Sequence, residues 1–210
     1  MSKQLDGKVA VVTGAGTGIG RAVARLFASE NARVVLAGRR MDKLKEVQTD
    51  IAAAGGDSHP VTTDVTSEDS VIALFRSAIE RYGRVDILVN NAGASTSGET
   101  DKLPLAKWQK VIDTNLTGAF LCSREAFGLM KAQRSGRIIN MGSVSAIVPR
   151  NGSAAYGASK FGLEGLTRAM AIEGRAFGVA VSVAQPGNTL PGLWSGREEQ
   201  ARKEGIMDAD

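Results

Sequence analysis

The sequence offers little sulfur or imidazole chemistry, since it holds one cysteine, Cys122, and one histidine, His59. A lone cysteine excludes an internal disulfide and fits a reducing cytoplasm, where we expect the protein to reside. With so few ligands of these kinds, we predict no metal ion and do not expect a Ser/His/Asp triad. We interpret Cys122 as a small core residue and His59 as a strand residue without a chemical role.

Long apolar runs and charge of one sign are also missing. No run reaches the 18 or more residues of a membrane span, and the polar residues 1–8 lead directly into a strand-like run. We therefore expect neither a signal peptide nor a membrane partner. Lys and Arg number 26 against 22 Asp and Glu, and they are scattered among the acids. Without the basic stripe typical of nucleic-acid binders, we expect no nucleic-acid partner.

The sequence does contain a regular alternation of strand-like and helix-like segments. Short apolar runs predict strands over residues 8–12, 33–38, 58–62, 85–89, 137–141 and 179–184. Helical periodicity predicts a helix around residues 19–27 and further helices over residues 43–54, 67–82, 107–134 and 156–177. Connections are short and no linker divides the chain. The pattern predicts one α/β domain over residues 1–210, a Rossmann-type, doubly wound parallel sheet between two layers of helices.

A glycine-rich turn, Thr13–Gly20, links the first strand to the first helix. Glycines allow a tight turn and let a pyrophosphate approach the helix amino terminus, where free N–H groups and the helix dipole favour negative charge. A strand-to-helix turn without a ligand would also use glycine, but the strand–helix–strand order favours a dinucleotide. We expect cofactor contacts from Gly14, Thr17, Gly18, Ile19 and Gly20.

The end of the second strand bears on the choice between NADP(H) and NAD(H). A carboxylate there would bind the ribose hydroxyls and repel a 2′-phosphate, but the chain has Gly38 followed by Arg39 and Arg40. Two guanidinium groups can pair with a phosphate, although a solvated basic pair in a loop is the alternative interpretation. We predict that NADP(H) is preferred over NAD(H).

Several further motifs follow in order, and together they resemble the classical short-chain dehydrogenases/reductases. The matching segments are Thr13–Gly20, Asp64-Val65, Asn90-Asn91-Ala92-Gly93, Asn115, Ser143, Tyr156-Gly157-Ala158-Ser159-Lys160 and Pro186-Gly187. The resemblance covers about residues 7–187. It implies reversible hydride transfer between a nicotinamide cofactor and a carbonyl/alcohol pair.

Tyr156 and Lys160 lie four residues apart in a predicted helix, so both project from one face. An ammonium about 5 Å away, at an effective dielectric constant near 20, stabilises a phenolate by roughly 3 kcal/mol. Tyr156 is therefore our candidate acid/base. By resemblance, Lys160 also binds the ribose, Ser143 holds the substrate oxygen and Asn115 supports a water relay. Taken singly, each residue could instead have a purely structural role.

The resemblance implies further cofactor contacts. Asp64 would bind the adenine edge and Val65 would line the ring, with a helix-preceding cap as the alternative role for Asp64. Asn90 would hold the fourth strand against the cofactor loop. The remaining contacts that we expect come from Asn91, Ala92, Gly93, Pro186, Gly187 and Thr189.

The chain departs from the family pattern in two places. Thr17 stands where many NADP(H)-using members carry a basic residue. Members also continue past the sixth strand, whereas residues 192–210 are charged and contain no strand-like run. Because an unpaired edge would expose backbone donors and acceptors, we expect the chain to be truncated at its carboxyl end.

Two predicted helices carry apolar residues on more than one face, those over residues 107–134 and 156–177. In the family these helices pair with their symmetry mates, so we expect a homodimer or homotetramer built through them.

The substrate pocket should be formed by residues 94–99, 144–152 and 188–194, which mix apolar groups with Ser and Asn. An alcohol, a ketone or a 3-oxoacyl thioester would fit. One alternative function is a cofactor-binding regulator or structural subunit that keeps the fold without turnover. Another is a nucleotide-sugar epimerase, which the glycine spacing and the chain length disfavour.

Overall fold

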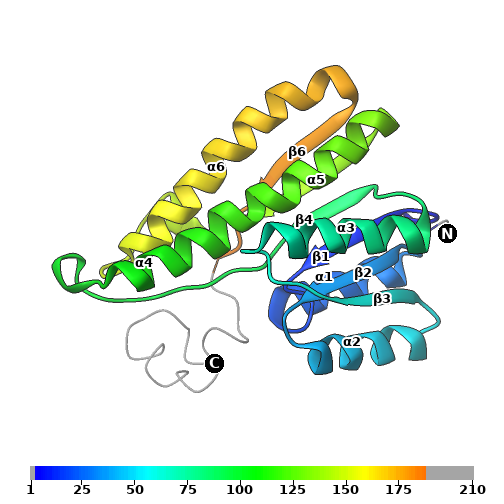
Figure 1. The fold of residues 1–210 in the computed structure, drawn as a ribbon, viewed down its shortest axis with the longest axis horizontal. Helices are drawn as coiled ribbons and strands as arrows, with labels where there is room; N and C mark the ends of the chain where they lie inside the picture. The colour runs from blue at the N-terminus through cyan, green and yellow to red at the C-terminus, as the bar shows by residue number, and fades with distance from the viewer. Residues whose placement is uncertain (1–2, 188–210) are drawn as a thin grey trace.

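The computed structural model describes residues 3–187. Within them a six-stranded parallel sheet has the order β3-β2-β1-β4-β5-β6 (Figure 1). The strands are β1 (Val9–Thr13), β2 (Arg33–Gly38), β3 (Asp57–Thr62), β4 (Ile87–Asn90), β5 (Gly136–Met141) and β6 (Val179–Ala184). In the centre, Val11 pairs with Val35 on one side and Leu88 on the other. This arrangement confirms the predicted doubly wound sheet.

Helices cover both faces of the sheet. They are α1 (Gly18–Ser29), α2 (Met41–Ala53), α3 (Glu68–Tyr82), α4 (Leu105–Ile112), α5 (Gly118–Gln133) and α6 (Ala154–Gly174). Helices α1 and α2 pack on one face, against side chains such as Val12 and Leu36. Helices α3, α5 and α6 lie on the opposite face (Figure 1). Among residues 3–187, no helix is long and apolar enough to cross a membrane.

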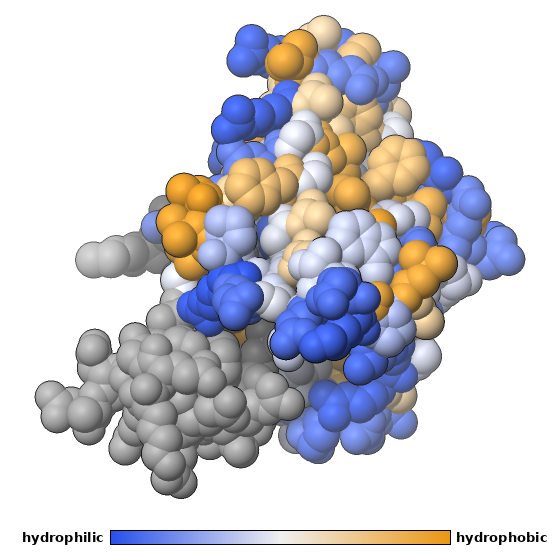
Figure 2. All heavy atoms as spheres, turned by 90° about the vertical axis from the view of Figure 1, so that its left-hand side faces the viewer, coloured by the Kyte–Doolittle hydropathy of each residue, from blue (hydrophilic) through white to orange (hydrophobic). Residues whose placement is uncertain are grey.

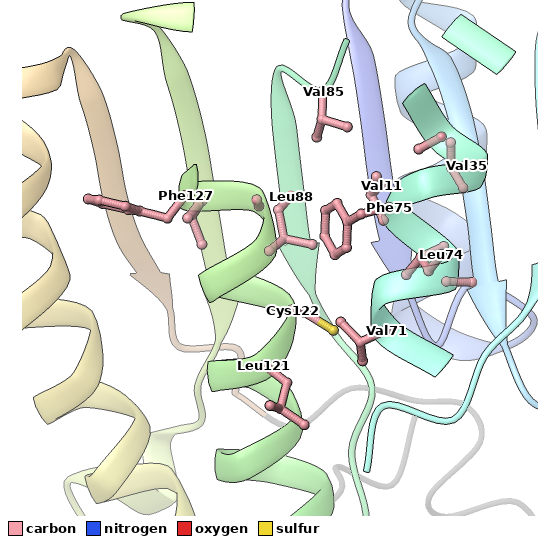
Figure 3. Close-up of a cluster of buried hydrophobic side chains, with 14 of the residues drawn as sticks. Val11, Val35, Val71, Leu74, Phe75, Val85, Leu88, Leu121, Cys122 and Phe127 are labelled. Atoms are coloured by element: carbon pink, nitrogen blue, oxygen red, sulfur yellow. The ribbon is translucent and has the colours of Figure 1, made fainter. Parts of the chain in front are cut away.

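The larger apolar core lies between the sheet and the layer that contains α3 and α5. Phe75, Leu88 and Cys122 meet there with less than a twentieth of their surface exposed (Figure 3). Burial raises the pKa of the Cys122 thiol to about 12, so the thiol stays protonated at neutral pH. Cys122 is thus a core residue, as predicted. His59 contacts Ser77 and the edge of the Tyr82 ring from β3.

One helix prediction is wrong, because the structure interrupts the helix that was expected to be continuous. The segment expected as a single helix over residues 107–134 is α4, then a π-helical turn (Asp113–Thr117), then α5. A π turn inserts an extra residue into the helical repeat and is frequent at functional sites. Here it contains Asn115. The helix expected over residues 156–177 is α6 followed by a 3-10 turn (Arg175–Phe177).

Candidate active site

The predicted site residues gather at the carboxyl ends of the strands. Because all six strands are parallel, the segments that follow them emerge at one edge of the sheet. The glycine turn follows β1, and Arg39 follows β2. Asn91 follows β4, Ser143 follows β5, and Pro186 follows β6. Thr189 lies outside the described residues.

The turn between β1 and α1 has the geometry of an anion cradle. Gly14 adopts φ +64°, and a Cβ on Gly20 would overlap the Gly14 carbonyl oxygen and Asn91 Nδ2. Helix α1 begins after Thr17 with no side-chain cap and no acid in its first turn. Its first N–H groups and the positive end of its dipole therefore face the edge of the sheet without a side-chain acceptor. These residues fit the pyrophosphate of a dinucleotide.

Asn91 and Thr13 fasten this turn to β4. The Asn91 Nδ2 atom donates to Thr13 O at 2.9 Å and to Gly14 O at 3.2 Å. In return, Thr13 Oγ1 accepts from the backbone N–H groups of Asn91 (2.9 Å) and Ala92 (3.0 Å). The sheet edge thus holds the loop through an amide and a hydroxyl.

The role expected of Asn90 is corrected by these contacts. The Asn90 side chain projects to the opposite face, where its Nδ2 donates to Ser123 Oγ and Asn140 Oδ1, both at 2.8 Å. Asn90 therefore links β4 to α5 and β5, and it does not link β4 to the cofactor loop. Successive side chains of a strand point to opposite faces, so Asn91 takes the role that was assigned to Asn90.

Arg39, Arg40 and Asp64 lie at the ends of β2 and β3. Both arginines are exposed, and neither makes an ion pair within the described residues. Hydrogen bonds from the Thr66 N–H and hydroxyl hold the pKa of Asp64 below its ordinary value, and the positive charge of Arg39 adds to this. Ser67, and not Asp64, caps α3, by accepting from Ser70 N. The carboxylate of Asp64 is therefore ionised at neutral pH beside Arg39.

Asn115 joins three segments from inside its π turn. It is buried, its Oδ1 accepts from Ala94 N at 2.7 Å, and its Nδ2 donates to Ala94 O at 2.9 Å. The same Nδ2 donates to Ser159 Oγ at 3.0 Å, and Ser159 Oγ donates to Tyr156 O at 2.7 Å. Asn115 thereby connects the loop after β4 with the first turns of α6.

Lys160 is buried beside Tyr156. Its Nζ donates to Met141 O at 2.6 Å and lies 5.5 Å from the centre of the Tyr156 ring. Burial lowers the pKa of Lys160 from 10.5 to about 8, and no carboxylate pairs with this ammonium within residues 3–187. Tyr156 is half-buried, and its hydroxyl makes no hydrogen bond to any described residue. The Tyr156 hydroxyl therefore has no partner among the described residues, and the Lys160 ammonium has donors beyond the one that Met141 O accepts.

Ser143 stands at the start of the loop that follows β5. Its Oγ accepts from Ser145 N at 3.1 Å, and no acceptor in the described part of the chain takes its hydrogen. The two described parts of the expected substrate pocket meet, because Gly98 N donates to Gly152 O at 3.0 Å. The third part, residues 188–194, lies outside the described residues. A hollow of about 410 Å³ lies between α1 and α2, and Ser143 is not among the residues that line it.

Sequence reasoning missed Ser159 as a separate element of the site. It is fully buried between Asn115 and the Tyr156 backbone. Its position directly before Lys160, within the Tyr156–Lys160 motif, was the available signal. The contact itself depends on the packing of α6 against the π turn.

Comparisons with known proteins find matches over most of the chain. The model of the short chain dehydrogenase family matches residues 8–202. The 3-oxoacyl-[acyl-carrier-protein] reductase of Synechocystis sp. is 39% identical over 184 residues, which cover 87% of this chain and 74% of the relative. The cis-4-hydroxycyclohexanecarboxylate dehydrogenase of Sinomonas cyclohexanicum is 40% identical over 188 residues, with 89% and 75% covered. A metagenomic short-chain oxidoreductase, solved in complex with NADP, is 41% identical with a TM-score of 0.84, and the match covers 88% of this chain and 84% of that structure.

Proposed function

Because the chain belongs to the classical short-chain dehydrogenase/reductase family and is thus an oxidoreductase, we propose that it interconverts an alcohol and a carbonyl compound with NADP(H). The observation that carries this proposal is the buried ammonium of Lys160 beside the Tyr156 ring. A buried cation without an acidic partner destabilises a fold, so its presence next to an unbonded phenol supports a chemical role.

The residues would divide the work as follows. In alcohol oxidation, Tyr156 Oη accepts the proton of the substrate hydroxyl; in carbonyl reduction it returns that proton. The charge of Lys160 stabilises the phenolate form, and its ammonium binds the ribose. Ser143 donates its free hydrogen to the substrate oxygen, where charge develops. Asn115 supports the water relay that returns protons to solvent. A nicotinamide cofactor bound at this edge would supply the hydride acceptor or donor.

The preference for NADP(H) rests on the end of β2. Gly38 leaves no carboxylate there to repel a 2′-phosphate, and Arg39 and Arg40 are exposed beside it. The negative charge of Asp64 stays near Arg39, and we expect this carboxylate to accept a hydrogen bond from the adenine amino group. The NADP complex of the metagenomic relative is consistent with this choice of cofactor.

For the substrate, we propose an alcohol, a ketone or a 3-oxoacyl compound with an apolar substituent. Ile147 and Val148 are exposed in the loop that follows Ser143. Figure 2 faces the end of the molecule that carries α4 and shows apolar groups spread among polar ones on this side. The names of the two curated relatives specify a 3-oxoacyl and a cyclohexane substrate.

We further propose a cytoplasmic homodimer or homotetramer. Phe120 on α5 and Phe161 on α6 are 44% and 49% exposed, although both are large apolar side chains. A two-fold contact through α5 and α6 would bury Phe120 and Phe161 on each of the two subunits.

A substrate panel tests the proposed reaction. The protein is mixed with NADPH and, in turn, with ketones, 3-oxoacyl thioesters and cyclic oxo acids, and the loss of NADPH absorbance is followed. We expect at least one class to be reduced with saturation kinetics. Cofactor binding without turnover on any class, in either direction, would favour the regulatory alternative.

A further inference from the structure

The segment that leaves β6 toward Pro186 is bonded to the loop that carries Ser143. Gly142 N donates to Ala184 O at 2.7 Å, and Val144 N donates to Pro186 O at 3.4 Å. These two donors flank Ser143. The close approach needs a glycine, because a Cβ on Gly142 would lie 2.7 Å from Val183 Cγ2.

A side-chain contact ties the same segment to the catalytic helix. Gln185 Nε2 donates to Glu164 Oε2 at 3.2 Å, and both side chains are partly buried. Glu164 lies one helical turn after Lys160, yet its carboxylate contacts Gln185 and the exposed Arg168. Lys160 donates to a backbone carbonyl instead. The acid therefore bridges α6 and the segment after β6.

This bridge lies at one end of the expected dinucleotide site. Arg39 follows β2 and Pro186 follows β6, and the sheet order places three strands between them. At about 4.8 Å per strand, the two ends are roughly 19 Å apart. A contact beside Pro186 can thus affect the nicotinamide half of a bound cofactor without touching the adenosine half.

We propose that Glu164 and Gln185 form a positioning pair that sets the affinity for the nicotinamide half of the cofactor. The pair holds the segment after β6 against α6, so that Pro186 and Gly187 meet the nicotinamide in a fixed place. The proposal rests on the proposed function, because it requires that a nicotinamide dinucleotide binds at this edge.

Calorimetric titration with a whole cofactor and with its adenosine fragment separates this role from a general structural one. The ligands are NADPH and adenosine 2′,5′-bisphosphate, or NADH and ADP if the wild-type protein prefers NADH. Gln185→Ala and Glu164→Ala should each raise the Kd of the whole cofactor about fivefold to tenfold, as expected for a charge-assisted hydrogen bond in a partly exposed place. The Kd of the fragment should change less than about twofold.

Two further variants provide the matched control and the rescue. Arg168→Ala removes the other partner of Glu164 and should leave both Kd values unchanged. Gln185→Glu places two carboxylates together and should weaken cofactor binding most. Adding Glu164→Gln to it restores one amide and one carboxylate with their places exchanged, and should return the Kd to within about twofold of wild type.

The outcomes separate the two proposals. If Gln185→Ala leaves the Kd of the whole cofactor unchanged, weakens both ligands equally, or is not rescued by the exchanged pair, the positioning role is wrong and the proposed function stands. If the wild-type protein binds neither dinucleotide, the proposed function is wrong and the positioning role falls with it.

Discussion

Replacing Lys160 with methionine should change the pH dependence of stability in a specific direction. Burial lowers the pKa of Lys160 from 10.5 to about 8. This pKa shift corresponds to roughly 3 kcal/mol. At pH 7 the buried amine holds its proton, so the unfolding free energy is lower by that amount. Methionine has a similar length and no charge, so Lys160→Met removes this loss.

The substitution also removes a favourable contact. Lys160 Nζ donates to Met141 O at 2.6 Å, and losing that hydrogen bond destabilises the fold by about 1–2 kcal/mol. At pH 7 the variant should therefore be more stable than wild type by about 1–2 kcal/mol. Its turnover should nevertheless be lost, because the phenolate of Tyr156 would have no neighbouring cation.

The sign of the difference should reverse with pH. Between pH 8 and 10.5 the unfolded wild-type chain binds more protons at Lys160 than the folded chain does, so wild-type stability rises through this window. At pH 10 and above the variant should be the less stable protein. Burial also raises the pKa of Cys122 and of Tyr82 to about 12. Above about pH 9 these two raised pKa values lower the unfolding free energy of both proteins equally. Their effects therefore cancel in the difference between the two proteins.

Urea denaturation of both proteins without cofactor, at pH 7, 8, 9 and 10, measures this difference. A difference in unfolding free energy that stays constant from pH 7 to pH 10 would mean that Lys160 is not a buried cation. The electrostatic part of the Tyr156–Lys160 account would then be refuted.

Three further predictions concern the cofactor loop, the cofactor and the assembly. Arg39→Asp should lower kcat/KM for NADPH and raise it for NADH. The control Lys45→Asp, at an exposed position on α2, should change neither value. A wild-type preference for NADH would contradict the phosphate-binding role of Arg39 and leave it as a solvated residue. Asn91→Ala removes the donors to Thr13 O and Gly14 O, so cofactor binding should weaken and the unfolding free energy should fall by about 1–3 kcal/mol in urea titrations; unchanged values would show that the loop holds its shape without this amide. Light scattering at micromolar concentration should give a multiple of the 22.0 kDa chain mass, and a monomer mass that does not change on concentration would contradict the proposed contact through α5 and α6.

The fold was predictable because its signals are local and repeated. The central strand β1 is fully buried and appears in the sequence as a continuous apolar run. The cap of α3 at Ser67 and its end at Gly83 were also visible as residue types. Each of these features depends on a few neighbouring residues, which a sequence shows directly.

The details of the site depend on contacts that local patterns do not encode. A single π turn shifts the helical repeat too little to be seen among the apolar residues near Asn115. Adjacent strand residues such as Asn90 and Asn91 point to opposite faces, and the sequence does not say which face meets the glycine loop. Glu164 and Gln185 are 21 residues apart and meet only because α6 packs on β6.

The most direct test of the central claim is turnover by Tyr156→Phe, measured together with its cofactor affinity. Phenylalanine keeps the ring that lies beside Lys160 and removes the proton donor and acceptor. We expect the Kd for NADPH to stay within about threefold of wild type while kcat falls by far more than tenfold, which exceeds about 1.4 kcal/mol in the barrier. If the variant retains more than about a tenth of wild-type kcat, Tyr156 is not the acid/base and the account is contradicted.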